Sequence, residues 1–495
     1  MKKISLIALL LSLLSCTDLV EKSFSEVQPK AYFTNEKSIE SIATPAYAQL
    51  HKYVWNYWLI SELPSDELLA LDREYANDFK LLSYQEFYPQ LESPNLLWNE
   101  CYDGIGACNN GLYLLKEVTN FEQYKAVKEA ELRTLRAFYY YQLMDIFGNV
   151  PLTKSIKEQN SGLPQTSRAE LFDFCVQELN EAIKALPDKA EYARVNKRIA
   201  QTLLAKILLN GVIYRNQEKW AECNTVCGEI IKSGQYQLEP NYYSNFKTRN
   251  ENSKETILPI GFSSNIDLGF PNMNLYMMTL HYNQMPASPW NGFATVAEVY
   301  DSFAENDVRR KTLWLGDQYS DLTWPEKSTK GTLLKTRRGD RLSFTKGPFT
   351  NTWQEEAGIR VPKYEPDLNA PGGQGENDFL IFRYADIIIA KAEALVHLGQ
   401  NEEALQLVNQ IRGRAGIEKL TKINLDLILE ERGREFYWEG LRRQDQIRFG
   451  KFQKINRISD GSKITFKKTE LHKALYPIPS YQMMLNPKLK QNPGY

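Results

Sequence analysis

Histidine is scarce in this sequence, and the motifs that usually mark an enzyme are missing. Only four of the 495 residues are His, and they are scattered along the chain at His51, His281, His397 and His472. There is no Gly-rich phosphate loop, no Gly-x-Ser-x-Gly elbow and no His-Glu-x-x-His. A catalytic site needs a positioned nucleophile, an acid–base pair or a metal. The sequence therefore predicts a binding protein with no catalytic residues, no cofactor and no metal.

An excess of charge of either sign is also missing. The chain has 60 basic and 61 acidic residues, which leaves a formal net charge of −1. Proteins that bind nucleic acid carry a concentrated positive charge that neutralises phosphates. The composition therefore argues against nucleic acid as a partner.

Cysteine is rare, with six residues in the whole chain. Cys101 and Cys108 stand at i, i+7, and Cys223 and Cys227 stand at i, i+4, but no His joins either pair at metal-ligand spacing. Free Cys packs as a small hydrophobe. These four cysteines and Cys175 are predicted to be buried free thiols.

The apolar run at the N-terminus is too short to cross a membrane. Ile4 to Leu14 falls well short of the roughly 20 residues that a membrane-spanning helix needs. Lys2 and Lys3 precede the run, which is typical of a secretory signal. Leu13-Leu14-Ser15-Cys16 resembles a bacterial lipobox, so residues 1–15 are predicted to be a lipoprotein signal peptide and Cys16 the acylated N-terminus of a tether over residues 16–33. The alternative is a plain signal peptide that contains a Cys.

Aromatic residues, in contrast, are plentiful. The chain has 28 Tyr, 22 Phe and 9 Trp, and 43% of its residues are hydrophobic, which is ample for a large core. Most of these rings are expected to be core residues. Exposed rings with a polar edge would favour a ligand surface.

Helical periodicity is strongest near the C-terminus. Apolar residues from Ala385 to Val396 lie on one helical stripe, Gly399 ends that helix, and Asn401 is expected to cap a second helix. The two helices form a hairpin with tetratricopeptide-like spacing. A third helix is expected after the cap Asn424, with ion pairs at i, i+4 between Glu430 and Arg434 and between Glu439 and Arg443.

Further helical patterns predict a mostly all-α scaffold of stacked hairpins. One helix is expected from Asn35 to Tyr53 with a bend at Pro45, and others start at a Ser167–Glu170 capping box and at Asn196. Two long patterns cover 96–118 and 121–147, and the spacing of 216–221 repeats that of 399–404. Two regions lack this periodicity: 54–94, and the Gly- and Pro-rich stretch 253–378, in which only 294–303 is expected to be helical.

Four segments together resemble the SusD/RagB family of outer-membrane nutrient-binding lipoproteins of gut-type bacteria. They are RYADIIIAKAEAL (383–395), EERGREFYWEGLRRQD (430–445), RTLRAFYYYQLMDIFGNVPL (133–152) and LYPIPSYQMMLNPKLKQNPGY (475–495). Leu441 departs from the pattern, because the family more often has His there. The resemblance implies one domain over 34–495, with a helical scaffold at 34–252 and 379–454, an irregular ligand-face insertion at 253–378 and an irregular C-terminal segment at 455–495.

The resemblance also implies a function in nutrient uptake and polysaccharide utilisation. Such a protein is anchored by lipid in the outer membrane at the cell surface, binds oligosaccharides and hands them to a SusC-like TonB-dependent transporter. Asp18 and Glu21 look like the acidic export mark of surface lipoproteins in this group. Three alternatives are a peptide-binding member of the family, a helical glycan-active enzyme and a repeat scaffold that binds protein partners.

The resemblance also implies where the ligand lies, because in that family the ligand face is built by the loop after the first helix, here within 54–94, together with the irregular central insertion, here 253–378. Long loops on a helical scaffold are commonly functional. Sugars offer apolar faces and hydroxyl rims, which suit aromatic platforms beside polar groups. Nine residues are therefore predicted to contact the ligand: Trp55, Tyr57, Trp58, Asp66, Arg73, Asn77, Tyr282, Trp290 and Trp324. Trp314 and Trp353 are the next rings to consider.

Overall fold

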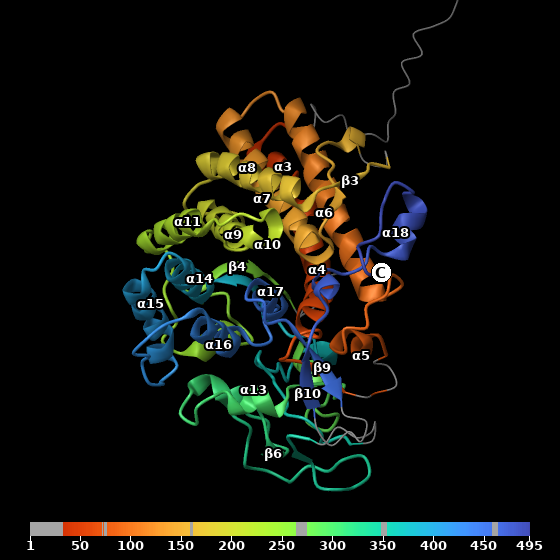
Figure 1. Cartoon of the computed structure of the whole chain (residues 1–495), viewed down its shortest axis with the longest axis vertical. Coiled ribbons are helices and arrows are strands. Elements are labelled where there is room, and N and C mark those ends of the chain that lie inside the picture. The colour runs from red at the N-terminus through yellow and green to blue at the C-terminus, as the bar shows by residue number, and fades with distance from the viewer. Residues whose placement is uncertain are drawn as a thin grey trace, which may run out of the picture.

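The computed structural model describes residues 33–71, 73, 77–158, 162–263, 275–347, 354–457 and 464–495. Helices dominate this part of the chain, as Figure 1 shows, and the prediction of a mostly helical fold is confirmed. The scaffold helices are α3 (Glu36–Glu40), α4 (Thr44–Glu62), α5 (Asn77–Ser83), α6 (Glu92–Glu117), α7 (Glu122–Phe147), α8 (Arg168–Ala185), α9 (Lys197–Leu209), α10 (Gly211–Arg215), α11 (Trp220–Lys232), α14 (Tyr384–His397), α15 (Asn401–Arg414), α16 (Leu425–Phe436) and α17 (Arg442–Arg448).

The long helices pack on one another in succession. Contacts join α4 to α6, α6 to α7, α7 to α8, α8 to α9, α9 to α11, α11 to α14 and α14 to α15. Helix α14 packs on α11 although more than 150 residues separate them along the chain. The arrangement agrees with the expected stack of helical hairpins, interrupted once by a long insertion.

A short antiparallel ribbon closes that insertion at its base. Strand β4 (Thr256–Ile260) pairs with β8 (Phe379–Arg383), with Thr256 opposite Arg383 and Ile260 opposite Phe379. All ten residues of the ribbon are buried. The chain therefore leaves the helical stack and re-enters it at one place, from which the insertion extends into the lower part of Figure 1.

The insertion contains little regular structure. It holds α12 (Leu275–Thr279), α13 (Ala297–Asp301), β5 (Phe293–Ala294) and the pair β6 (Gly316–Asp317) and β7 (Ser343–Phe344). The expectation of a single helix at 294–303 is wrong, since α12 is helical too. The side chains of this five-residue helix are all buried. It has no polar face, so its sequence does not show the alternation of apolar and polar residues by which a helix is predicted.

The first predicted helix is two helices, and the second is longer than expected. Asn35 caps α3 in a capping box with Ser38, and Pro45 lies in the first turn of α4 instead of bending a continuous helix. Helix α4 then runs on to Glu62, through residues that were expected to form a loop. Its last five residues, 58–62, are all buried, so apolar periodicity is lost there although the helix continues.

Two predictions about the C-terminal helices are wrong, and one is confirmed. Asn424 caps α16 as expected, whereas the cap position of α15 is Gln400, which makes no side-chain cap bond. Helix α16 ends at Phe436, and the left-handed Trp438 follows with φ 62°. Glu439 therefore does not share a helix with Arg443 and pairs instead with Arg383 and Lys363.

The described cysteines are free thiols in the core. Cys101, Cys108, Cys175, Cys223 and Cys227 are all buried and unbridged, which confirms that prediction. Cys16 lies outside the described residues. None of the helices in the described ranges is both long and apolar enough to cross a membrane.

The C-terminal segment folds back onto the scaffold. It forms the hairpin β9 (Gln453–Arg457) and β10 (Ile464–Lys468) and ends with α18 (Ser480–Leu485). The Tyr476 N–H donates to the Ile146 carbonyl at 2.9 Å, and the Asn492 amide donates to the Phe147 carbonyl at 2.9 Å. These bonds fix the tail against the end of α7.

Candidate ligand-binding face

The two regions that were expected to form the site lie against each other. Strand β1 (Leu69–Ala70) pairs with β5 of the insertion, and the Thr295 hydroxyl donates to the Glu67 carbonyl at 2.7 Å. The Arg73 Nε donates to the Asn291 carbonyl at 3.0 Å. The segment after α4 is thus joined directly to the part of the insertion that carries Trp290.

Trp290 stands on a rigid and strained turn. Ser288 and Asn291 on either side of it have φ values of 51° and 50°, a left-handed conformation that costs energy for residues other than glycine. The turn is nevertheless fixed, because the Trp290 N–H donates to the Met277 carbonyl at 2.7 Å and the Asn291 N–H to the Leu280 carbonyl at 2.9 Å. The Trp290 side chain is 43% exposed at this fixed position.

A buried arginine holds the turn from below. Arg360 donates from Nε and Nη2 to Asn291 Oδ1 at 3.0 and 2.6 Å, and its other guanidinium donors bind the carbonyls of Glu355, Ala357 and Gly358. The Asn291 amide in turn donates to the Glu355 carbonyl at 3.0 Å. A buried guanidinium satisfied in this way rigidifies the loop that it binds.

Glu355 also organises the neighbouring ring, Tyr282. Burial lowers the pKa of His281 to about 4, so its imidazole is neutral at neutral pH. The Asn283 N–H donates to His281 Nδ1, which leaves Nε2 to donate to the Glu355 carboxylate at 2.8 Å. The same carboxylate accepts the Arg337 backbone N–H at 2.9 Å, and the Arg337 guanidinium lies 3.5 Å from the centre of the half-buried Tyr282 ring.

The three predicted rings on the N-terminal side belong to α4, where Trp58 is buried in the core and Trp55 and Tyr57 are half-buried against it. Trp58 has no exposed surface, and its Nε1 donates to the Trp438 carbonyl at 2.9 Å. The Tyr57 hydroxyl donates to the Gly440 carbonyl at 2.7 Å, and Trp55 stacks on Trp58 with ring centres 6.3 Å apart. The expectation that these rings lie on a loop is wrong, since α4 continues through them.

The polar residues of that segment have separate surroundings. Asp66 forms a two-point ion pair with Arg442 at 2.7 and 2.9 Å and lines a cavity of about 230 Å³. Arg73 is almost fully buried and donates to backbone carbonyls, whereas Asn77, the first residue of α5, is exposed.

Trp324 lies in another part of the insertion. Its Nε1 donates to the Pro362 carbonyl at 2.8 Å, its ring meets Tyr243 edge-on at 5.2 Å, and it lines a different cavity of about 500 Å³. Trp314, the first reserve ring, is buried, and Trp353 lies outside the described residues.

Sequence reasoning missed the residues that build the face around Trp290. Arg337 belongs to a basic stretch that is visible in the sequence. Arg360, Asn291 and Glu355 gave no signal, because their roles depend on contacts between loops far apart along the chain.

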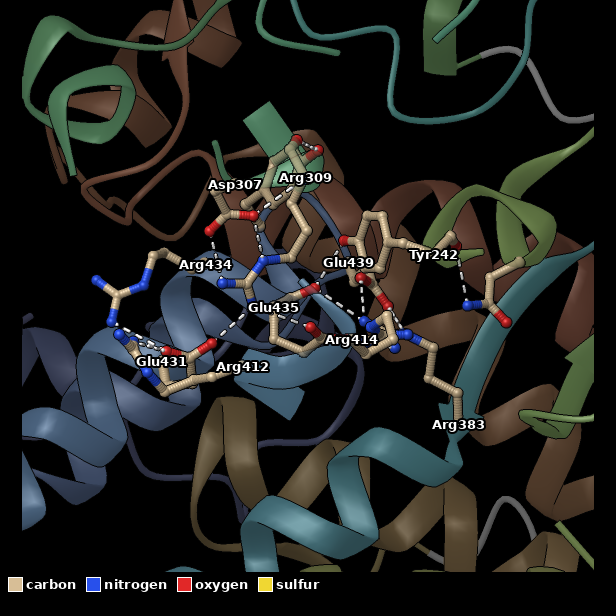
Figure 2. Close-up of polar contacts among 12 residues, drawn as sticks. Tyr242, Asp307, Arg309, Arg383, Arg412, Arg414, Glu431, Arg434, Glu435 and Glu439 are labelled. Atoms are coloured by element: carbon tan, nitrogen blue, oxygen red, sulfur yellow. Dashed lines mark hydrogen bonds and ion pairs between the residues drawn. The ribbon is translucent and has the colours of Figure 1, made fainter. Parts of the chain in front are cut away.

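A dense cluster of buried charge lies where the scaffold helices meet the insertion (Figure 2). Arg309, Arg383 and Arg414 are buried and surround the carboxylate of Glu435, with nitrogen–oxygen distances of 2.5 to 3.0 Å. Burial raises the pKa of Glu435, but the three guanidinium groups outweigh it and hold that pKa below its ordinary value. A carboxylate kept ionised in this way is unsuited to donating a proton.

Two family models match the chain. The model described as the SusD family covers residues 215–495, and the model described as starch-binding associating with outer membrane covers residues 8–209.

Curated relatives match over most of their length. The starch-binding protein SusD of Bacteroides thetaiotaomicron is 25% identical over 482 residues, which cover 88% of this chain and 84% of that protein. The SusD-like protein P38 of Formosa agariphila is 24% identical and matches 100% of this chain and 99% of its own.

Solved structures share the fold. A SusD superfamily protein from Parabacteroides distasonis has a TM-score of 0.76 at 21% identity and matches 93% of this chain and 99% of its own. Surface glycan-binding protein A from Bacteroides thetaiotaomicron, solved in complex with laminarihexaose, has a TM-score of 0.72 at 24% identity and matches 92% of this chain and 99% of its own.

Proposed function

Because this chain belongs to the SusD family, we propose that it is a cell-surface glycan-binding lipoprotein that acts by binding alone, without chemistry on its ligand. It captures oligosaccharides and delivers them to a SusC-like TonB-dependent transporter in the outer membrane. Capture and release are then coupled to a conformational change of the transporter complex. The similarity to the starch-binding protein SusD and to surface glycan-binding protein A supports this proposal.

The observation that carries the proposal is the Trp290 turn. A large ring that is 43% exposed and fixed by backbone hydrogen bonds offers a flat apolar surface to the CH face of a sugar. Since the turn is already rigid, binding loses little conformational entropy there. The proposed glycan site is centred on Trp290 and includes Tyr282, whose segment is joined to the turn through Glu355.

A glycan array with the purified full-length protein, followed by calorimetry on the glycans that bind, tests this proposal. Stacking of a flat ligand on an aromatic ring is worth ~1–3 kcal/mol, so Trp290→Ala is expected to weaken binding roughly tenfold. The matched control is Tyr113→Ala, which removes a ring of similar exposure, 42%, from helix α6. Circular dichroism verifies that both variants fold.

The control variant is expected to bind as the parent does. If Trp290→Ala binds every identified glycan as tightly as the parent, the site lies elsewhere. A protein that binds no glycan at all, in an array that includes neutral and charged polysaccharides, contradicts the proposed function.

A further inference from the structure

Although the whole chain is almost neutral, it carries a local excess of positive charge next to the proposed glycan site. Residues 327–347 carry seven basic residues and a single acidic one, Asp340. The basic residues are Lys327, Lys330, Lys335, Arg337, Arg338, Arg341 and Lys346. A concentrated charge of one sign on an otherwise balanced surface attracts ligands of the opposite sign.

This stretch is a defined loop with a fixed turn. Lys335 pairs with Arg341 across it, and the Leu342 N–H donates to the Leu334 carbonyl at 2.9 Å. The turn is closed by the Thr336 N–H, which donates to the Asp340 carbonyl at 2.8 Å. Arg337 and Arg338 therefore stand at the tip of a structured loop.

Several of these basic groups already have carboxylate partners. Arg341 forms a two-point ion pair with Asp317, and Lys346 pairs with Asp301. Arg338 lies 3.5 Å from the Asp340 carboxylate. Their charge is partly offset by these carboxylates, so each contributes little to attraction at a distance.

Arg337 and Lys335 differ from these residues. Within the described ranges, neither the guanidinium of Arg337 nor the ammonium of Lys335 forms an ion pair, and both side chains are exposed. Both residues are fixed to the segment that carries Tyr282. The Arg337 N–H binds the Glu355 carboxylate, and the Asn283 amide donates to the Lys335 carbonyl at 2.8 Å.

Because Arg337 stacks on Tyr282, its guanidinium is oriented to bind an anion. With its central carbon 3.5 Å from the ring centre, the guanidinium has one face on the aromatic ring. Its N–H donors point outward in the guanidinium plane, in the fork that matches two oxygens of a carboxylate or sulfate. Stacking also limits the rotamers of the side chain, so binding costs less entropy than at a free arginine.

Glu355 links this cation to the Trp290 turn. Its carbonyl accepts the amide of Asn291, the residue after Trp290, and its carboxylate accepts the Arg337 N–H. The carboxylate of Glu355 is itself occupied by that N–H and by neutral His281. The aromatic platform and the cationic group are therefore held in fixed positions by one shared residue.

We propose that this face selects anionic glycans, which carry uronate carboxylates or sulfate esters, with Arg337 binding the charged substituent of a sugar chain that packs on Trp290. This inference rests on the proposed function. It names the chemical class of the ligand at the same site.

Two matched pairs of probes test the proposal by calorimetry on the full-length protein. Oligogalacturonate is compared with its methyl ester, and κ-carrageenan oligosaccharides are compared with uncharged agarose oligosaccharides. The parent is expected to bind the charged member of at least one pair about tenfold more tightly, as a charge-assisted two-point hydrogen bond allows. The pair that shows the difference distinguishes carboxylate from sulfate recognition.

Two variants test whether Arg337 causes the preference for the charged glycan. Arg337→Gln is expected to bind both members of the pair equally and to lose most of the salt dependence of binding. The control Arg341→Gln, on the same loop, removes an arginine already paired with Asp317 and is expected to keep the preference. Either a parent that binds neutral members as tightly as charged ones or an Arg337→Gln variant that keeps the preference overturns the proposal.

The variant Trp290→Ala distinguishes a failure of the anion proposal from a failure of the proposed glycan site. If it weakens binding of charged and neutral glycans alike while Arg337→Gln has no effect, only the anion proposal fails. If neither variant alters the binding of a glycan that the protein does bind, the assignment of the whole face fails. Absence of binding to any charged probe likewise overturns the anion proposal.

Discussion

At the scale of single residues, the scaffold contains buried charges that are paired with charges of the opposite sign. Arg309 has no exposed surface, and its guanidinium donates to Asp307 at 2.7 and 2.9 Å and to Glu431 at 2.7 Å. Moving an ion out of water costs several kcal/mol unless partners compensate, so removal of one partner is far more damaging than loss of a surface pair.

The carboxylate of Glu435 is shared by Arg309, Arg383 and Arg414. Glu435→Gln is therefore expected to destabilise the protein by about 3–5 kcal/mol. The control is Glu430→Gln on the same helix, whose carboxylate is 59% exposed and 3.8 Å from Arg434. That change is expected to cost at most about 0.5 kcal/mol. Urea unfolding of parent and variants measures both values, and equal losses would show that the buried cluster is energetically unimportant.

The lowered pKa of Glu435 also fixes the direction of its pH dependence. The folded state holds the carboxylate ionised below the unfolded value of 4.5. Its contribution to stability is therefore complete above that pH and is lost as the pH falls. The difference in free energy of unfolding between the parent and Glu435→Gln is therefore expected to shrink as the pH falls below 4.5.

Residue patterns predicted part of this chemistry. The alternation of Glu and Arg after residue 430 indicated a structural network, and the structure has one. The identity of the partners was not predictable, because Arg309, Arg383 and Glu255 come from segments that meet only in the folded chain.

At the scale of elements, α4 is held against the link between α16 and α17. The last residue of α4, Glu62, accepts the Gly440 N–H, and Trp58 binds the Trp438 carbonyl. Gly440 has φ 83°, and a Cβ there would lie 2.8 Å from the Tyr57 ring, so glycine is required on both grounds.

Burial raises the pKa of Glu62 to about 8, and this junction should therefore weaken as the pH rises. Between pH 4.5 and 8 the Glu62 carboxyl holds a proton in the folded state but has released it in the unfolded state. The free energy of unfolding therefore falls as the pH rises through this range. Glu62→Gln removes this dependence. Relative to the parent, its free energy of unfolding is expected to rise by roughly 1 kcal/mol per pH unit between pH 5 and 8.

Thermal unfolding at four or five pH values measures that difference, with Glu86→Gln, an exposed residue, as the control. The control should run parallel to the parent. A Glu62→Gln curve that also runs parallel to the parent would mean that Glu62 is ionised in the fold.

Helix boundaries were predictable where a helix has a polar face and a cap. The Ser167–Glu170 capping box and the Asn196 cap start α8 and α9 as expected. Prediction failed where a helix is buried on all sides, as in the last five residues of α4, because periodicity then disappears. It also failed at Trp438, since its left-handed conformation is imposed by contacts of the folded chain and not by its residue type.

At the scale of the whole molecule, the sequence indicated helical hairpins, whereas the complete architecture came from resemblance to a family. The position of the proposed site at the junction of the two irregular regions followed from that resemblance. The residues of the proposed face did not follow from it, since Trp58 is buried while the proposed face includes Arg337 and is fixed by Asn291. Pairing of β1 with β5 joins segments more than 220 residues apart, and no local pattern encodes such a contact.

The last prediction concerns attachment of the whole protein to the membrane. The lipobox-like Leu13-Leu14-Ser15-Cys16 predicts that Cys16 carries the lipid. Each buried CH₂ of an acyl chain contributes ~0.8 kcal/mol, so two or more chains give stable anchoring and their loss releases the protein. Parent protein is expected to incorporate labelled palmitate, enter the detergent phase and copurify with a large β-barrel transporter after gentle solubilisation.

Cys16→Ala is expected to abolish both labelling and detergent partitioning, because Cys16 is the cysteine that the lipobox-like pattern predicts to be acylated. Cys175→Ala is the matched control, since it removes a buried free thiol from the folded domain and should leave both properties intact. A Cys16→Ala protein that still enters the detergent phase would contradict lipidation at this residue. A parent that is lipidated but monomeric after gentle extraction would contradict the transporter partner alone, because anchoring needs only the N-terminus whereas delivery of a glycan needs a barrel beneath the binding face.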